Sequence, residues 1–130
     1  MTPTGRHLLL ECWGCPSQIL SDPETLQSDL AQAVQAAGAT VIKAQFHRFA
    51  QGGVSGVILL AESHISAHTW PECGYAALDF YTCGAANPLL AKDLLLERLK
   101  PDHWEALEIA RGEREGFREL MRDSNAKRDL

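Results

Sequence analysis

The sequence predicts an α+β fold, a two-layer sandwich in which an antiparallel β-sheet carries helices on one face. Several segments alternate apolar and polar side chains, which is typical of strands with one buried face. Two other segments repeat apolar residues every three or four positions, as amphipathic helices do. These elements follow in the order strand, helix, strand, strand, repeated approximately, and this order favours a sheet covered by helices.

The first strand and the first helix are predicted from local signals. Residues 7–13 are a strand, and Ser21, Pro23 and Glu24 supply a cap residue, a first-turn proline and a capping-box acid for the helix that follows. Gly38 ends this helix. Its apolar stripe consists of Leu26, Leu30, Val34 and Ala37.

The rest of the chain predicts a second helix and further strands. The helix begins at Asn87 and Pro88 and stops before Pro101. The remaining strands are expected at residues 41–49, 54–61, 65–70, 75–82 and 103–109. The strand and helix pattern ends near residue 112, so we expect a domain over residues 1–112. Residues 113–130 are a charged tail, interpreted as a short surface helix that frays.

Composition narrows the class of protein. The chain has 130 residues, of which 45% are hydrophobic, and a formal charge of −5. The acidic balance disfavours nucleic acid as a partner, because phosphates demand a basic face. No apolar stretch approaches a membrane span or the core of a signal peptide, so the expected location is the cytoplasm. A chain this small would benefit from a partner subunit that buries a sheet face.

Cys12 and Cys15 form a C-x-x-C pattern directly after the first predicted strand. This spacing is shared by redox and metal sites. A non-catalytic protein that binds a metal or works through these thiols is therefore one candidate function. A buried structural role for Cys12 is the simpler interpretation, because a second pair at metal-site spacing is missing from the sequence.

Residues 61–84 hold a second and richer set of reactive side chains. Glu62 and Ser63 form a junction followed by His64, and His68 and Cys83 are expected within reach of it. The serine is a candidate nucleophile, His68 a candidate base and the Cys83 thiol a candidate acid.

This run, together with GRHLLLECWGC at residues 5–15 and FHRFAQGGVSGVILLAESH at residues 46–64, resembles the small prokaryotic form of the pyruvoyl-dependent S-adenosylmethionine decarboxylases. The resemblance implies cleavage between Glu62 and Ser63, which converts Ser63 into a pyruvoyl group that forms a Schiff base with the substrate amine. It also implies that His68 assists processing, that Ser55 supports it and that Cys83 returns a proton to the product. It assigns no direct chemistry to His64 and predicts no metal site.

The resemblance further implies S-adenosylmethionine as substrate, with spermidine synthesis as the destination of the product. Phe49 and Glu72 match the positions that stack on adenine and hold the ribose, and Trp70 and Glu11 are further candidates for substrate contact. Departures such as Cys73 keep open a pyruvoyl-dependent decarboxylase of a free amino acid, arginine or ornithine. A homodimer of cleaved protomers is expected.

Overall fold

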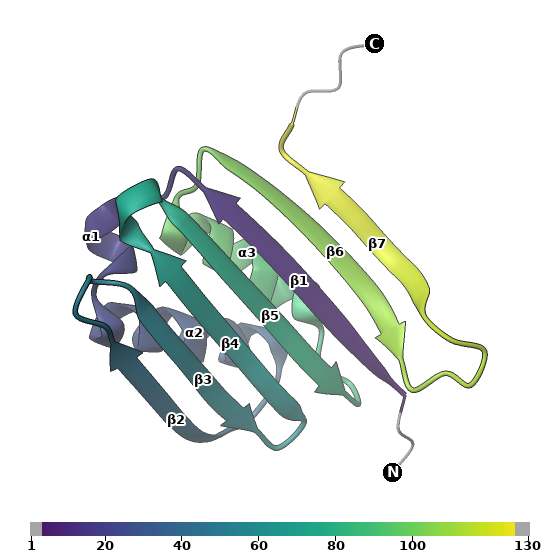
Figure 1. The fold of residues 1–130 in the computed structure, drawn as a ribbon. Coiled ribbons are helices and arrows are strands. Elements are labelled where there is room, and N and C mark those ends of the chain that lie inside the picture. The colour runs from purple at the N-terminus through teal and green to yellow at the C-terminus, as the bar shows by residue number, and fades with distance from the viewer. Residues whose placement is uncertain (1–3, 127–130) are drawn as a thin grey trace.

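The computed structural model describes residues 4–126 as one antiparallel sheet with helices on a single face (Figure 1). The predicted fold class is therefore confirmed. The elements are β1 (Gly5–Trp13), α1 (Ser17–Leu20), α2 (Pro23–Ala37), β2 (Val41–Arg48), β3 (Val54–Leu60), β4 (Ser63–Trp70), the 3₁₀ turn η1 (Pro71–Cys73), β5 (Tyr75–Cys83), α3 (Pro88–Leu99), β6 (His103–Arg111) and β7 (Arg118–Ser124).

Within the described part of the chain, seven strands lie in the order β2-β3-β4-β5-β1-β6-β7. The strand β1 sits between β5 and β6 and pairs antiparallel with both. Strands β3, β4 and β5 form a meander, so β4 is hydrogen-bonded on both edges. Pairing on both edges fixes the register of β4, which carries Ser63, His68 and Trp70 of the predicted site.

The helix α2 begins one residue later than its sequence signals suggested. The cap is Asp22, not Ser21, and its carboxylate accepts hydrogen bonds from the backbone N–H groups of Glu24 and Thr25. Pro23 occupies the first turn, and Gly38 ends the helix with a φ of +83°. The short helix α1 was not predicted, because four residues are too few for a periodic pattern.

The core lies between the sheet and the two long helices. The apolar residues of α2 that were predicted to form a stripe are buried, and α3 packs beside α2 over the same face. Each central strand contributes every second residue to this core, as in β5, where Ala76, Leu78 and Phe80 are buried.

The opposite face of the sheet carries no helix (Figure 1). Its side chains are the other half of each alternating strand, and many of them are polar or titratable. Four apolar members of this face are nevertheless well exposed, namely Leu9, Val57, Leu59 and Trp70. The candidate site lies on this open face.

Both edges of the sheet differ from expectation. The edge strand β2 was predicted to bury one face, but Ile42 is 59% exposed, and only Ala44 and Phe46 pack against the core. The described part of the charged tail, residues 113–126, is not helical, because residues of β7 pair with β6. Hydrogen bonding to a neighbouring strand replaces the helix that its charges suggested. The last residues of the tail, 127–130, and residues 1–3 of the predicted domain lie outside the described range.

Across residues 4–126, the helices are all too short or too polar to cross a bilayer.

Candidate active site

The peptide bond between Glu62 and Ser63 lies where the β3–β4 turn enters β4. Ser63 has a φ of +149°, a backbone conformation that residues other than glycine rarely adopt. Such a residue stores on the order of 1–3 kcal/mol of strain. The Glu62 side chain accepts a hydrogen bond from the backbone N–H of Thr40 at 3.0 Å, which anchors the residue before the strained one. The junction is thus bent and held in place.

Cys83, at the end of β5, lies directly against this junction. Its backbone N–H donates to the carbonyl oxygen of Glu62 at 3.1 Å, and its thiol donates to the same oxygen at 3.2 Å. Two donors on one carbonyl oxygen polarise the carbonyl and stabilise negative charge that develops there. The carbonyl of Glu62 is therefore prepared for attack by a nucleophile.

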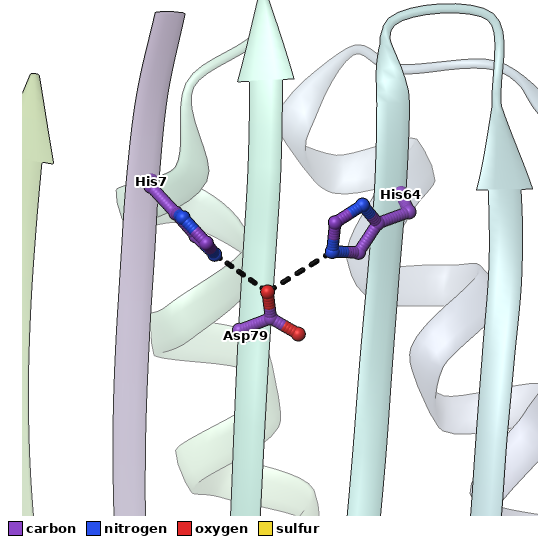
Figure 2. Close-up of side chains that lie close together, drawn as sticks. All are labelled: His7, His64 and Asp79. Atoms are coloured by element: carbon purple, nitrogen blue, oxygen red, sulfur yellow. Dashed lines mark hydrogen bonds and ion pairs between the residues drawn. The ribbon is translucent and has the colours of Figure 1, made fainter. Parts of the chain in front are cut away.

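Next to the junction, Asp79 joins two histidines on the open face (Figure 2). One oxygen, Oδ2, lies 2.5 Å from Nε2 of His7 and 3.0 Å from Nε2 of His64. The other oxygen, Oδ1, accepts from the hydroxyl of Ser66. The histidines come from β1 and β4, on either side of β5, so pairing of the three strands assembles the cluster.

The ionisation of Asp79 follows from these contacts. Burial is the largest single influence and raises the pKa, but the hydrogen bonds from His7, Ser66 and His64 together lower the pKa to about 2. An ionised carboxylate only accepts hydrogen bonds, so both histidines must carry a proton on Nε2.

The guanidinium of Arg111 completes the cluster. It donates to Nδ1 of His7 at 3.3 Å and lies over the ring of Tyr81, which stacks on His7. His7, His64 and Asp79 could offer three ligand atoms to a metal ion. Because Arg111 has only donors, however, the proton of neutral His7 stays on Nε2 and blocks that nitrogen as a ligand. The cluster is better suited to moving protons than to holding a metal.

A separate hollow of about 420 Å³ lies at the far end of β4. It gathers five of the residues singled out from the sequence: Phe49, Ser55, His68, Trp70 and Glu72. The Ser55 hydroxyl lies 2.8 Å from Nδ1 of His68, on paired positions of β3 and β4. The structure therefore brings the predicted processing histidine together with three of the four predicted substrate contacts.

The hollow and the Glu62–Ser63 junction are far apart in one chain. Ser63 and His68 are five residues apart on the extended strand β4, which separates them by about 16 Å at a rise of ~3.3 Å per residue. The expectation that His68 lies within reach of its own junction is therefore wrong. Cys83 does lie within reach of the junction, because β5 runs antiparallel to β4 and ends beside Glu62.

Comparison with known proteins decides the family. A model of the family described as S-adenosylmethionine decarboxylase matches residues 6–112. A proenzyme of that name from Methanococcus vannielii is 48% identical over 115 residues, covering 86% of this chain and 93% of its own. The chain belongs to the S-adenosylmethionine decarboxylase family. The corresponding proenzyme of Acetivibrio thermocellus is 44% identical over 113 residues, with 86% and 91% covered.

A solved structure agrees with this placement. The crystal structure of the adenosylmethionine decarboxylase from Aquifex aeolicus superposes with a TM-score of 0.75 at 35% identity, and the match covers 83% of this chain and 90% of that one. The family named from the sequence is therefore confirmed, together with its fold. The strand β7 lies beyond the 6–112 match of the S-adenosylmethionine decarboxylase family.

Glu11, the fourth of the predicted substrate contacts, does not line the hollow of about 420 Å³ with the other three. It lines a larger hollow of about 830 Å³ over the middle of the open face, which His68 and Asp79 also line. The Tyr75 hydroxyl donates to Glu11 at 2.5 Å. Burial, followed by this bond to a carboxylate, raises the pKa of Tyr75 to about 12. Glu11 thus has a defined partner within its own chain.

Cys12 and Cys15 are free thiols that lie in the core. The hydrogen bond between them raises the pKa of Cys12 and lowers the pKa of Cys15, and burial opposes ionisation of both. The two thiols point to the helix side of the sheet, away from the open face that carries the candidate site.

Sequence reasoning missed the residues that surround Ser63. His64 was noticed only as part of the motif, and His7, Asp79 and Arg111 were not considered. One signal was available, because the alternation of β5 places Asp79, Tyr81 and Cys83 on one face. Which strands flank β5 was not visible in the sequence, so the two histidines could not be assigned to its sides.

Proposed function

We propose that this protein is an S-adenosylmethionine decarboxylase that cleaves its own chain between Glu62 and Ser63 and works with a pyruvoyl group made from Ser63. The observation that carries the proposal is the carbonyl of Glu62, held by two donors of Cys83 beside a strained Ser63. An ordinary turn between two strands needs neither feature. Both features suit a junction that must react.

Self-cleavage would proceed by rearrangement and elimination. The Ser63 hydroxyl attacks the carbonyl carbon of Glu62, and the C–N bond breaks, so the amide becomes an ester and the serine nitrogen becomes an amine. Removal of the Ser63 α-proton then expels Glu62 as a carboxylate. Water converts the remaining dehydroalanine to the pyruvoyl group and releases ammonia. The proximity of hydroxyl and carbonyl replaces a bimolecular encounter.

After cleavage, the Ser63 end of the site would carry the groups that the decarboxylation itself needs. The pyruvoyl group supplies a carbonyl that accepts the electrons released with CO₂. The Cys83 thiol, which contacts the oxygen of Glu62 before cleavage, becomes free to protonate the substrate carbon after Glu62 has left. One thiol would therefore serve both processing and turnover.

A second copy of the chain would complete the site. His68 and Ser55 lie about 16 Å along the strand from their own Ser63, so they can act on a junction only in another protomer. In such a dimer the two open faces would pack against each other, related by a two-fold axis that runs between them perpendicular to the strands. This rotation reverses the strand direction of one sheet relative to the other. It brings the His68 end of each copy over the Ser63 end of its partner. The exposed Leu9, Val57 and Leu59 would be buried between the sheets.

The hollow around His68 would then hold the substrate next to the partner's pyruvoyl group. Phe49 and Trp70 offer aromatic faces that attract a sulfonium and stack on a purine. Glu72 offers a carboxylate for ribose hydroxyls. A nucleoside sulfonium would use all three, whereas arginine or ornithine would use only the charge.

The intact mass of the purified chain under reducing, denaturing conditions tests the proposal. We expect pieces 1–62 and 63–130, with the second piece lighter than simple hydrolysis requires because the serine nitrogen has left as ammonia. Ser63→Ala should remain one chain. The split protein should release CO₂ from S-adenosylmethionine and not from arginine or ornithine. A wild-type chain that stays whole would overturn the proposal, and release from arginine alone would overturn its substrate.

A further inference from the structure

Ser63, His64 and Asp79 form a continuous hydrogen-bonded chain. The Ser63 hydroxyl lies 3.4 Å from Nδ1 of His64, and Nε2 of the same ring lies 3.0 Å from Asp79. The first distance is long for a hydrogen bond, as contacts between nucleophile and base often are before the reacting geometry forms. The order of groups is hydroxyl, imidazole and carboxylate.

The proton positions in this chain follow from its ends. Because the Asp79 carboxylate is ionised, it requires a donor at Nε2 of His64. In a neutral imidazole the other nitrogen, Nδ1, then has a free lone pair, and that nitrogen faces the Ser63 hydroxyl. Asp79 therefore orients the ring and selects the tautomer in which Nδ1 can accept a proton.

We infer that His64 is the base that takes the Ser63 hydroxyl proton in the first step of self-cleavage, with Asp79 as the residue that positions it. The inference rests on the proposed function. The Ser63 oxygen attacks the carbonyl carbon of Glu62 while its proton moves to Nδ1 of His64. The negative charge forms on the oxygen that Cys83 already holds. The imidazolium then gives the proton to the Ser63 nitrogen as the C–N bond breaks, so ester formation consumes and releases nothing.

Two other histidines near the site do not satisfy the same geometry. His68 lies about 16 Å along the strand from this serine. His7 contacts the same oxygen of Asp79 as His64 does, but its Nδ1 is occupied by Arg111. Ester formation would therefore need one chain only, whereas the later removal of the α-proton would need His68 of a second copy. The two histidine variants should accordingly stop at different chemical stages.

The stage at which each variant stops can be identified from the chemical state of its uncleaved chain, amide or ester. An ester between Glu62 and Ser63 has the same mass as the amide, but hydroxylamine cleaves the ester and leaves a free N-terminal serine at residue 63. We would translate full-length proenzymes in a cell-free system and follow splitting with time, with and without hydroxylamine. His64→Ala should split at least ~100-fold more slowly than wild type, the order expected for loss of a general base. Its unsplit chain should resist hydroxylamine, and added imidazole should restore splitting.

His68→Ala should also remain unsplit, but hydroxylamine should cut it after Glu62. His7→Ala is the matched control, because it removes the other histidine from Asp79 and leaves the Ser63 contact in place. It should slow splitting far less than His64→Ala. In Asp79→Asn the amide can donate to Nε2, which moves the ring proton to Nδ1, so this variant should split slowly and also resist hydroxylamine.

The outcomes separate this inference from the function on which it rests. A His64→Ala chain that splits at nearly the wild-type rate, or that hydroxylamine cuts, would overturn the role of His64 while the proposed function stands. A wild-type chain that never splits would overturn both. His64→Gln guards against misfolding, because glutamine keeps a donor for Asp79 but offers no basic nitrogen. Normal splitting of His64→Gln would also remove His64 from the step.

Discussion

The thiol of Cys83 lies 3.2 Å from the carbonyl oxygen of Glu62, and the backbone N–H of Cys83 contacts the same oxygen at 3.1 Å. The cysteine that the resemblance assigns to turnover therefore already contacts the bond whose cleavage is proposed to create the cofactor. One position at the end of β5 would serve two reactions in sequence. The two roles can be separated by choosing what replaces the thiol.

Cys83→Ser should still process itself, because a hydroxyl also donates to the Glu62 carbonyl and the backbone N–H remains. Cys83→Ala should process about tenfold more slowly. This is less than the roughly 100-fold lower limit for loss of an oxyanion donor, since a thiol is a weak donor. Both variants should return the proton poorly during turnover, because neither side chain is as acidic as a thiol. Intact mass against time measures the effect on processing, and CO₂ release measures the effect on turnover.

Cys73→Ser is the control, because it replaces an exposed thiol outside the junction. Unchanged turnover in Cys83→Ser would exclude the acid role.

Mixed dimers should rescue processing if the site is shared. Ser63→Ala keeps His68 but has no nucleophile, whereas His68→Ala keeps Ser63 but lacks the histidine that its partner needs. Each variant alone should stay whole. When the two are co-expressed, the His68→Ala chain should split, because an intact His68 in the partner reaches its junction. The two chains differ in mass, so mass spectrometry identifies which one is cut. Splitting of His68→Ala by itself would show that the site is not shared in this way.

Glu72→Gln should weaken substrate binding and leave self-cleavage intact. Glu72 lines the hollow near His68 and lies far along the strand from the Glu62–Ser63 junction. Loss of a charged hydrogen bond costs about 1.5–3 kcal/mol, so the KM for S-adenosylmethionine should rise roughly tenfold or more. Glu97→Gln, on the exposed side of α3, is the charge-matched control. A Glu72→Gln enzyme with the wild-type KM would contradict the assignment.

Asp79 should make the fold sensitive to acid. Its pKa in the folded protein is about 2, below the ordinary value of 3.8, so its ionised form stabilises the fold above pH ~4 and this contribution is lost as pH falls toward 2. A shift of this size corresponds to roughly 2 kcal/mol. Urea unfolding at several pH values between 5 and 2 should show a flatter pH dependence of the unfolding free energy in Asp79→Asn than in wild type. Equal slopes would mean that the hydrogen bonds from His7, His64 and Ser66 do not hold the carboxylate as described.

Much of the fold could be predicted because its signals are local. Alternation in residues 75–82 placed Phe80 in the core, and Asn87 and Pro88 marked the start of α3, because strand faces and helix caps depend on neighbours a few residues away. The prediction for residues 113–126 of the tail was wrong for the same reason, because their pairing is not local. The charges of the tail suggest a solvated helix, but β6 offers it a free edge, and pairing across a sheet has no local signature.

The sequence by itself determined the family, the fold class and the reactive junction, because these depend on residue types at fixed spacing along the chain. Only the tertiary structure decided which of those residues meet. The pairing of β4 and β5 brings Cys83 to Glu62, and the flanking β1 brings His7 to Asp79. The extension of β4 carries His68 away from Ser63, because five residues of strand reach further than any side chain can span.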